Sequence, residues 1–206
     1  MGDVGAHCLT EWADRASCTS PRYVERKPPW PASYAFPTSH GAIRLTSITF
    51  ESANQPEVIA LIAELDAYQD TLYPPEARYA LDLASLTQPN VVFAVARDTV
   101  GRAVGCGAVV LTPEFGELKR MFISPAARGQ GLAQRLLSEL EAEAAARGCR
   151  LVTLESGPYQ LEALALYARC GYVRRGPYGG YADDPLSVFM EKRIGLGVTA
   201  PAAGPA

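Results

Sequence analysis

The 206-residue chain has few of the residues that build metal sites and disulfide frameworks. It has two histidines, His7 and His40, and its five cysteines are scattered without a CxxC pair. We therefore expect neither a metal site nor a disulfide framework, and the sparse, odd cysteine count fits a reducing cytoplasm. The sequence also lacks a membrane-length apolar run and a basic-then-apolar leader. We expect a cytoplasmic protein without a membrane partner.

An excess of positive charge is missing as well. The formal net charge is −3, from 19 Lys and Arg against 22 Asp and Glu. A general nucleic-acid binder is usually basic, so no nucleic-acid partner is expected, whereas a cationic substrate is compatible with this charge. With 48% hydrophobic and 20% charged residues, the composition is that of a globular protein with a sizeable core.

The two ends of the chain differ in composition from the middle. Residues 1–40 include KPPWPASYAFPTS, where proline removes donors and blocks regular pairing, so we predict an irregular N-terminal arm. Residues 195–206 read GLGVTAPAAGPA and predict a flexible tail. One domain is expected between them, over 41–194.

Hydrophobic periodicity in this domain predicts an α/β fold with a mixed central sheet and helices on both faces. The predicted strands are 42–52, 91–97, 103–111, 116–123, 150–156 and a final pair within YVRRGPY and SVFMEKRI. The predicted helices are 56–73, around 76–86, 129–147 and 160–170. A right-handed crossover should make strands 116–123 and 150–156 parallel.

The stretch RGQGLA, residues 128–133, stands between a predicted strand and a predicted helix. One interpretation is an ordinary turn. The other is an anion site, since the first amides of a helix have no internal partners and glycine lets a ligand approach them. Neither a Walker loop nor a GxGxxG pattern is present.

Beyond this turn, MFISPAARGQGLAQRLLSELEAEAAARG resembles the acetyl-CoA-binding segment of the GNAT acetyltransferase superfamily. The family signature, Gln/Arg-x-x-Gly-x-Gly/Ala, is matched by Arg128, Gly131 and Ala133. LVTLES followed by QLEALALYARCGY is similar to the family's next strand and helix, so the resemblance spans about 42–194. It implies a GNAT-like acyl-CoA N-acyltransferase architecture, with acetyl-CoA as the acetyl donor.

The resemblance also implies which residues hold acetyl-CoA. In the family, the amides that follow the signature arginine grip the pyrophosphate; here they belong to Gly129, Gln130, Gly131, Leu132, Ala133 and Gln134. The last residues of the preceding strand, Met121, Phe122 and Ile123, would bond the pantetheine through their backbone, as an added strand does. Gln160 stands where the family often has an asparagine that contacts the cofactor. That strand separates from the next at a bulge in the family, which this sequence does not reveal.

Three side chains are candidates for the chemistry. Tyr167 matches the family tyrosine that protonates the departing thiolate, although its ring could equally be a packed helix aromatic. Glu155 matches a position where some members place the base that takes the amine proton, and Glu117 is the second candidate. A base of this kind is useful because an amine of pKa about 10.4 is mostly protonated at neutral pH. Water alone as the proton acceptor stays open.

The acceptor is the least defined part of the prediction. Tyr68, Tyr73, Tyr181 and Asp183 could receive a cationic amine, but GGYADDP also reads as a solvated turn. We expect an N-acetyltransferase that moves acetyl to a primary amine of a small metabolite or amino acid, by direct attack in a ternary complex. The alternatives are a protein N-terminal or lysine acetyltransferase and a non-catalytic acyl-CoA-binding module. Homodimers are frequent in the family, but no residue pattern here demands one.

Overall fold

The computed structural model describes residues 45–74 and 80–195. The predicted arm, 1–40, lies outside these ranges, and so does the predicted tail apart from Gly195. The division of the chain into arm, domain and tail therefore stays a prediction.

Within the described residues, seven strands form one mixed sheet in the order β1-β2-β3-β4-β5-β7-β6. Their bounds are β1 Leu45–Phe50, β2 Val91–Asp98, β3 Ala103–Leu111, β4 Gly116–Ile123, β5 Leu151–Ser156, β6 Val173–Arg175 and β7 Val188–Arg193. Neighbouring strands are antiparallel except β4 and β5, which are parallel. The parallel pair is the one that the crossover rule predicts.

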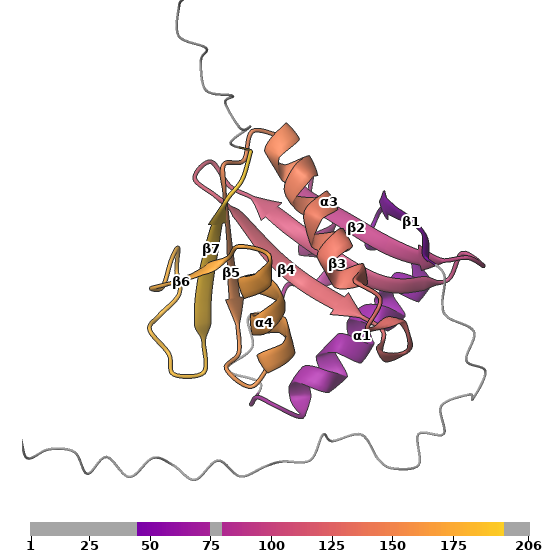
Figure 1. The fold of residues 1–206 in the computed structure, drawn as a ribbon, viewed down its shortest axis with the longest axis horizontal. Coiled ribbons are helices and arrows are strands. Elements are labelled where there is room, and N and C mark those ends of the chain that lie inside the picture. The colour runs from indigo at the N-terminus through magenta and orange to yellow at the C-terminus, as the bar shows by residue number, and fades with distance from the viewer. Residues whose placement is uncertain (1–44, 75–79, 196–206) are drawn as a thin grey trace, which may run out of the picture. The chain divides into compact units, whose positions relative to one another are not determined.

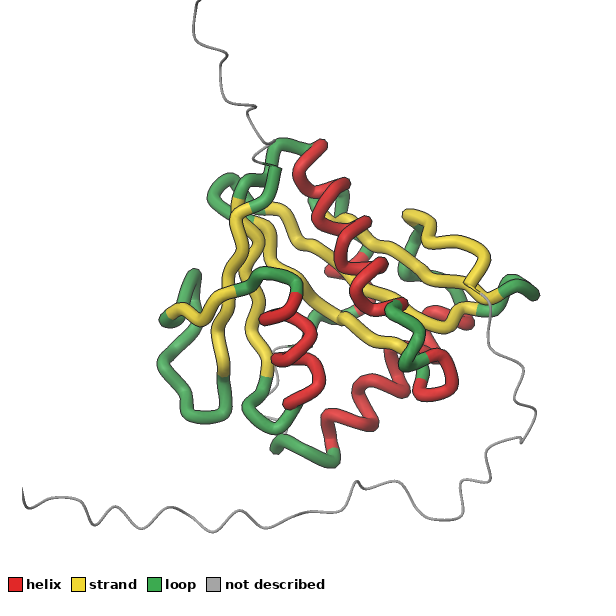
Figure 2. Tube along the Cα trace, viewed as in Figure 1, coloured by secondary structure: helices red, strands yellow, loops and turns green. Residues whose placement is uncertain are grey.

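Helices cover both faces of this sheet, as predicted (Figures 1 and 2). The helices are α1 Pro56–Asp70, α2 Leu83–Leu86, α3 Leu132–Ala146 and α4 Leu161–Arg169. In the figures α3 and α4 lie in front of the sheet and α1 lies behind it. None of them has the length and apolar character that crossing a membrane would need, within the ranges described.

Two predicted helices differ from the structure in their described parts. Helix α3 starts at Leu132 instead of residue 129, because Gly129 and Gly131 have φ values of +75° and +70°, outside the helical region. In the described part of the segment predicted at 76–86, the helix is the single turn α2, which begins where the Asp82 side chain accepts a hydrogen bond from the Ser85 amide.

The core has two layers, one on each face of the sheet. Along β2, Val92, Ala94 and Ala96 pack in the layer beneath α3, and Phe93 and Val95 pack in the layer beneath α1. This alternation follows from the two-residue period of a strand, and burial on both faces explains why the strand is almost wholly apolar. The two layers hold β2, β3 and β4 as a rigid frame for the strand edge described below.

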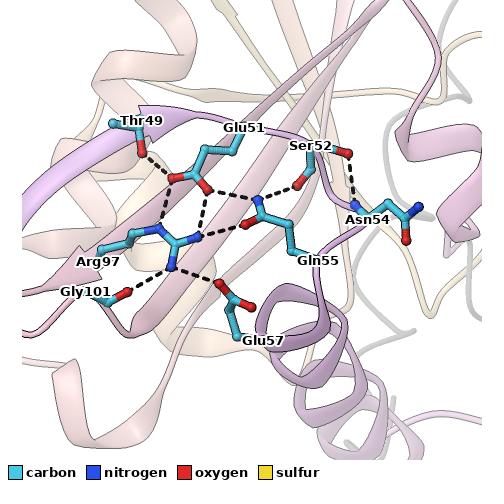
Figure 3. Close-up of polar contacts among 8 residues, drawn as sticks. All are labelled: Thr49, Glu51, Ser52, Asn54, Gln55, Glu57, Arg97 and Gly101. Atoms are coloured by element: carbon cyan, nitrogen blue, oxygen red, sulfur yellow. Dashed lines mark hydrogen bonds and ion pairs between the residues drawn. The ribbon is translucent and has the colours of Figure 1, made fainter.

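A polar cluster closes the start of α1 against β2 (Figure 3). The guanidinium of Arg97 donates to both carboxylate oxygens of Glu51, at 3.0 and 2.7 Å, and to Gln55, Glu57 and the Gly101 carbonyl. These bonds use all five N–H donors of the guanidinium. We call this set the Arg97 cluster, and it is a polar site that the protein satisfies by itself.

Candidate functional site

Strands β4 and β5 pair only at their first residues. Gly116, Glu117 and Leu118 of β4 face Val152, Thr153 and Leu154 of β5, and the ladder then stops. In Figure 1 the two strands run together at one end and diverge toward the end near α4. Among the described residues, the second half of β4 consequently has one backbone edge without a neighbouring strand, the kind of edge to which an extended ligand can pair.

A bulge in β4 accompanies this separation. Between the pairs Cys106–Phe122 and Ala108–Lys119, β3 contributes one residue, Gly107, and β4 contributes two. Arg120 is one of these two. Among the described residues it is the only one other than glycine with a positive φ, which is 56°. Its guanidinium is tied to Asp66 of α1 and to the Leu81 carbonyl, which compensates for the unfavourable conformation.

Gly107 makes room for this bulge. A Cβ atom at this position would come within 2.5 Å of the Met121 sulfur and 2.9 Å of Leu140 Cδ1. Met121 can therefore lie across β3 only because residue 107 has no side chain. The sequence offered no direct signal for the bulge, since its unusual residue is an arginine.

A groove of about 640 Å³ runs from the free edge of β4 to the starts of α3 and α4. It brings together nearly all residues predicted to bind the acetyl donor, with Gln130 outside its lining. The members are Met121, Phe122, Ile123, Arg128, Gly129, Gly131, Leu132, Ala133, Gln134, Gln160 and Tyr167. Tyr68, expected near the acceptor, also lines this groove.

The turn before α3 presents unpaired backbone donors to the groove. No amide of residues 129–134 donates to an acceptor within the described part of the chain, and the helix has no side-chain N-cap. The N-terminal end of a helix also carries partial positive charge. Together these features make an anion site suited to a diphosphate.

Arg128 is held in place by the end of the preceding strand, β4. Its Nε donates to the Ile123 carbonyl at 3.0 Å, and its guanidinium lies over the Phe122 ring. One carbonyl of the predicted pantetheine edge is thus already engaged by this arginine. Gln160 is also partly used, because its Oε1 accepts from Ser156 Oγ and the Gly157 amide at 3.2 Å each.

A smaller cavity of about 100 Å³ adjoins the groove. Met121, Gln160 and Tyr167 line both spaces, so the two meet at these side chains. The smaller cavity adds Glu155 and Tyr73 to this boundary. The hydroxyl of Tyr73 accepts from the Tyr159 amide at 2.9 Å, which fixes it at the wall of the cavity.

Tyr167 lies at the junction of the two spaces and is 7% exposed. Its ring packs against Tyr172, and no described residue hydrogen-bonds its hydroxyl. Burial raises the pKa of Tyr167 above its ordinary value. The phenol therefore stays protonated at neutral pH, the form that an acid needs.

Glu155 faces the smaller cavity from the end of β5. Burial raises the pKa of its carboxyl above the ordinary value, and a hydrogen bond from Ser187 Oγ to Oε1, at 2.9 Å, acts in the opposite direction. A carboxylate with a raised pKa beside a cavity has the character of a general base.

Glu117 is engaged with other residues. Its Oε1 accepts from the hydroxyls of Tyr178 and Tyr181, at 2.8 and 2.6 Å, and is 2.9 Å from Lys119 Nζ. Glu117 does not line either space. The hydroxyl of Tyr181 also contacts Lys119. Asp183 is exposed, and neither residue lines the groove or the cavity.

The cysteines of the described chain do not line the groove or the cavity. Cys106 is fully buried, where desolvation raises the pKa of its thiol to about 12, and neither Cys149 nor Cys170 lines the groove or the cavity. No three His, Cys, Asp or Glu residues in the described ranges gather as metal ligands do. The arrangement offers an anion-binding turn, a free strand edge, a partly buried carboxylate and a protonated phenol.

Known proteins that resemble this chain are acetyltransferases. Residues 58–172 match the model of the acetyltransferase (GNAT) family. The chain is 48% identical over 150 residues to an IAA acetyltransferase of Azospirillum brasilense, covering 72% of this chain and 97% of that protein. A solved structure from Klebsiella pneumoniae, assigned as an acyl-CoA N-acyltransferase, is 44% identical with a TM-score of 0.62, over 72% and 97% of the two chains.

The fold is shared more widely. The paiA N-acetyltransferase of Thermoplasma acidophilum, solved in complex with coenzyme A, has a TM-score of 0.55 at 15% identity, over 72% of this chain and all 100% of that one. At this identity the likeness concerns the fold alone.

Proposed function

Because the chain belongs to the GNAT family of acetyl-CoA-dependent N-acetyltransferases, we propose that it acetylates the primary amine of a small metabolite or amino acid by direct transfer in a ternary complex. The observation that carries the proposal is the meeting of the large groove and the small cavity at Tyr167, with Glu155 on the cavity side. Donor and acceptor would each have a space, joined where the acyl group must pass.

The groove fits acetyl-CoA on grounds of its own. The unpaired amides of residues 129–134 suit its diphosphate, and the edge of β4 beyond Leu118 suits the two amides of pantetheine. Acetyl-CoA supplies the thioester whose acetyl group is transferred. Arg128 would orient the turn through its bond to the Ile123 carbonyl.

We assign the base to Glu155 in preference to Glu117. Glu155 lines the small cavity, whereas Glu117 is outside it and already receives two tyrosine hydroxyls and a lysine. Glu155 would take the proton that the ammonium group must lose before its nitrogen attacks. As the C–N bond forms and the C–S bond breaks, the Tyr167 hydroxyl would give its proton to the sulfur, and the tyrosinate would regain one as the new amide nitrogen loses its extra proton.

A small acceptor is favoured by the size of the cavity. A volume of about 100 Å³ holds a small group, and Leu81, Leu118 and Leu186 form part of its wall. Direct transfer is favoured because none of the three described cysteines reaches either space.

The test is release of coenzyme A thiol from acetyl-CoA with a panel of free amines, amino acids, short peptides and IAA, the compound for which the Azospirillum relative is named. The proposal expects turnover with at least one free amine. Turnover with peptides alone would indicate a protein acetyltransferase. Tight coenzyme A binding by calorimetry, with no turnover on any acceptor, would indicate a binding module.

Paired variants test the catalytic assignments. Tyr167→Phe should lower kcat by about 100-fold and leave the Kd for coenzyme A within twofold, because general acid catalysis contributes about 10²–10⁴-fold. Glu155→Gln should lower kcat at neutral pH by a similar factor. Glu117→Gln, the matched control, should stay within a few fold of the parent; the reverse order of the two glutamate variants would reassign the base.

A further inference from the structure

The turn that leads into β7 brings a hydroxyl against the carboxylate of the small cavity. Asp184 organises this turn, since its Oδ1 accepts from the Leu186 amide at 2.7 Å and its carbonyl accepts from the Ser187 amide at 3.0 Å. Pro185, between Asp184 and Leu186, restricts the backbone of the turn further. The position of Ser187 is thus set by its own turn, independently of Glu155.

Ser187 then reaches across the sheet. Strands β5 and β7 are antiparallel, with Glu155 opposite Phe189 and Ser156 opposite Val188, so Ser187 lies next to the end of β5. Its Oγ donates to Glu155 Oε1 at 2.9 Å. Leu186, its neighbour in the turn, lines the same cavity as Glu155.

This bond is the one hydrogen bond that Glu155 receives from a side chain of the described residues. Oε1 is therefore held by the turn, and Oε2 has no such partner among them. A partly buried carboxylate with one anchored oxygen keeps one rotamer, and its second oxygen remains available to the acceptor.

We propose that Ser187 is a positioning residue for acetyl transfer, which anchors Oε1 of Glu155 so that Oε2 receives the proton of the acceptor amine. This inference rests on the proposed role of Glu155 as base. It assigns to the Asp184–Ser187 turn a part in catalysis that the sequence did not indicate, since a serine in a polar turn is unremarkable by itself.

The protonation of Glu155 also depends on the groups that surround it. The positive charge of Lys119 on β4 favours the carboxylate, and the negative charges of Glu117 on β4 and Asp184 in the turn oppose it. Tyr73 beyond α1 and Tyr167 of α4 face it as phenols. None of these charges is altered by exchange of Ser187 for a neutral residue, so the hydroxyl can be tested separately.

The experiment compares the pH dependence of kcat in Ser187→Ala and the parent with one amine. Loss of a donor to the carboxylate raises the pKa of Glu155, so the ascending limb should move to higher pH by about 0.5–1 unit. On the acidic side of the limb kcat should therefore fall by about 3–10-fold, and the difference should vanish as the pH rises above it. The KM for acetyl-CoA should not change.

Rescue provides the control. Ser187→Thr retains the hydroxyl, and its ascending limb should coincide with that of the parent. Should the alanine variant not fold, Ser187→Cys retains the volume with a weaker donor and should move the limb in the same direction by a smaller amount. An unmoved limb, or a loss of kcat by the same factor at every pH, would overturn the positioning role.

The outcome is separable from failure of the proposed base. If Glu155→Gln keeps the ascending limb of the parent, Glu155 is not the base and both proposals fall. If Glu155→Gln removes the limb while Ser187→Ala leaves it in place, only the role of Ser187 is overturned.

Discussion

At one end of the domain, the guanidinium of Arg97 gives all five of its N–H donors to acceptors of the protein (Figure 3). At the start of α3, the backbone amides of residues 129–134 have no acceptor among the described residues. Folded proteins pair most of their polar groups. The contrast suggests that the first region serves stability, and that the second is completed by a ligand.

The largest effect is expected on stability, from a substitution that breaks the Arg97 cluster. Arg97→Ala leaves Glu51, whose side chain is 21% exposed, without its cation. Removal of one partner of a mostly buried pair should lower the free energy of unfolding by about 2–3 kcal/mol. Denaturant unfolding measures this loss, and calorimetry should show an unchanged Kd for coenzyme A.

Arg147→Ala is the matched control, since Arg147 forms an exposed ion pair with Glu143 one helical turn away. Its expected cost is below about 0.5 kcal/mol. Equal losses in the two variants would remove the distinction between a structural cluster and a surface pair.

The pH dependence of the free energy of unfolding also tests the Arg97 cluster. Hydrogen bonds from Arg97, above all, lower the pKa of Glu51 from 4.5 to about 2. A lowered pKa adds stability above pH 4.5 that is lost as the pH falls toward 2. Allowing for solvent screening, the parent should exceed Glu51→Gln by about 1–2 kcal/mol near pH 7, and the difference should vanish toward pH 2. A difference that is constant over this window would contradict the assigned role of Glu51.

A substitution in the turn at residues 129–134 should weaken the binding of coenzyme A. Gly131 lines the groove with φ of +70°, and a methyl group added to its Cα would meet no described atom within 4 Å. Gly131→Ala should strain the backbone by about 1 kcal/mol and place its Cβ where the diphosphate is expected. We expect the Kd for coenzyme A to rise by about tenfold, which calorimetry would detect.

The smallest effect on coenzyme A binding is expected from a glycine-to-alanine substitution in the Arg97 cluster. Gly101, with φ of +83° and equally open surroundings, provides its carbonyl to Arg97. Gly101→Ala should therefore cost about 1 kcal/mol of stability and leave the Kd for coenzyme A unaltered. If both alanine variants weaken binding alike, backbone strain, and not occupation of the anion site, accounts for the effect at Gly131.

The sequence predicts what depends on local pattern. Period-two and helical hydrophobic spacing predicts the order of the elements and the parallel pair β4–β5. RGQGLA predicts the glycine turn, whose two positive φ values need glycine. The groove then follows largely from residues adjacent to one another in the chain.

Contacts between distant residues could not be predicted in this way. Glu117 and Glu155 are both carboxylates at strand ends in the sequence, and only folding gives the first to Tyr178 and Tyr181 and leaves the second at the cavity. Arg120 at the bulge likewise pairs with Asp66, 54 positions earlier in the chain. The assignment of the remaining site residues stays a prediction until variants are measured.

We propose that the amides of residues 129–134 bind the diphosphate of coenzyme A. An NMR titration of the ¹⁵N-labelled protein with coenzyme A, repeated with inorganic pyrophosphate, tests it directly. We expect both ligands to shift the amide protons of Gly129 and Gly131 downfield, as new hydrogen bonds form, and to leave that of Gly101 in place. Saturation with coenzyme A without movement of the Gly129 and Gly131 amides would contradict it.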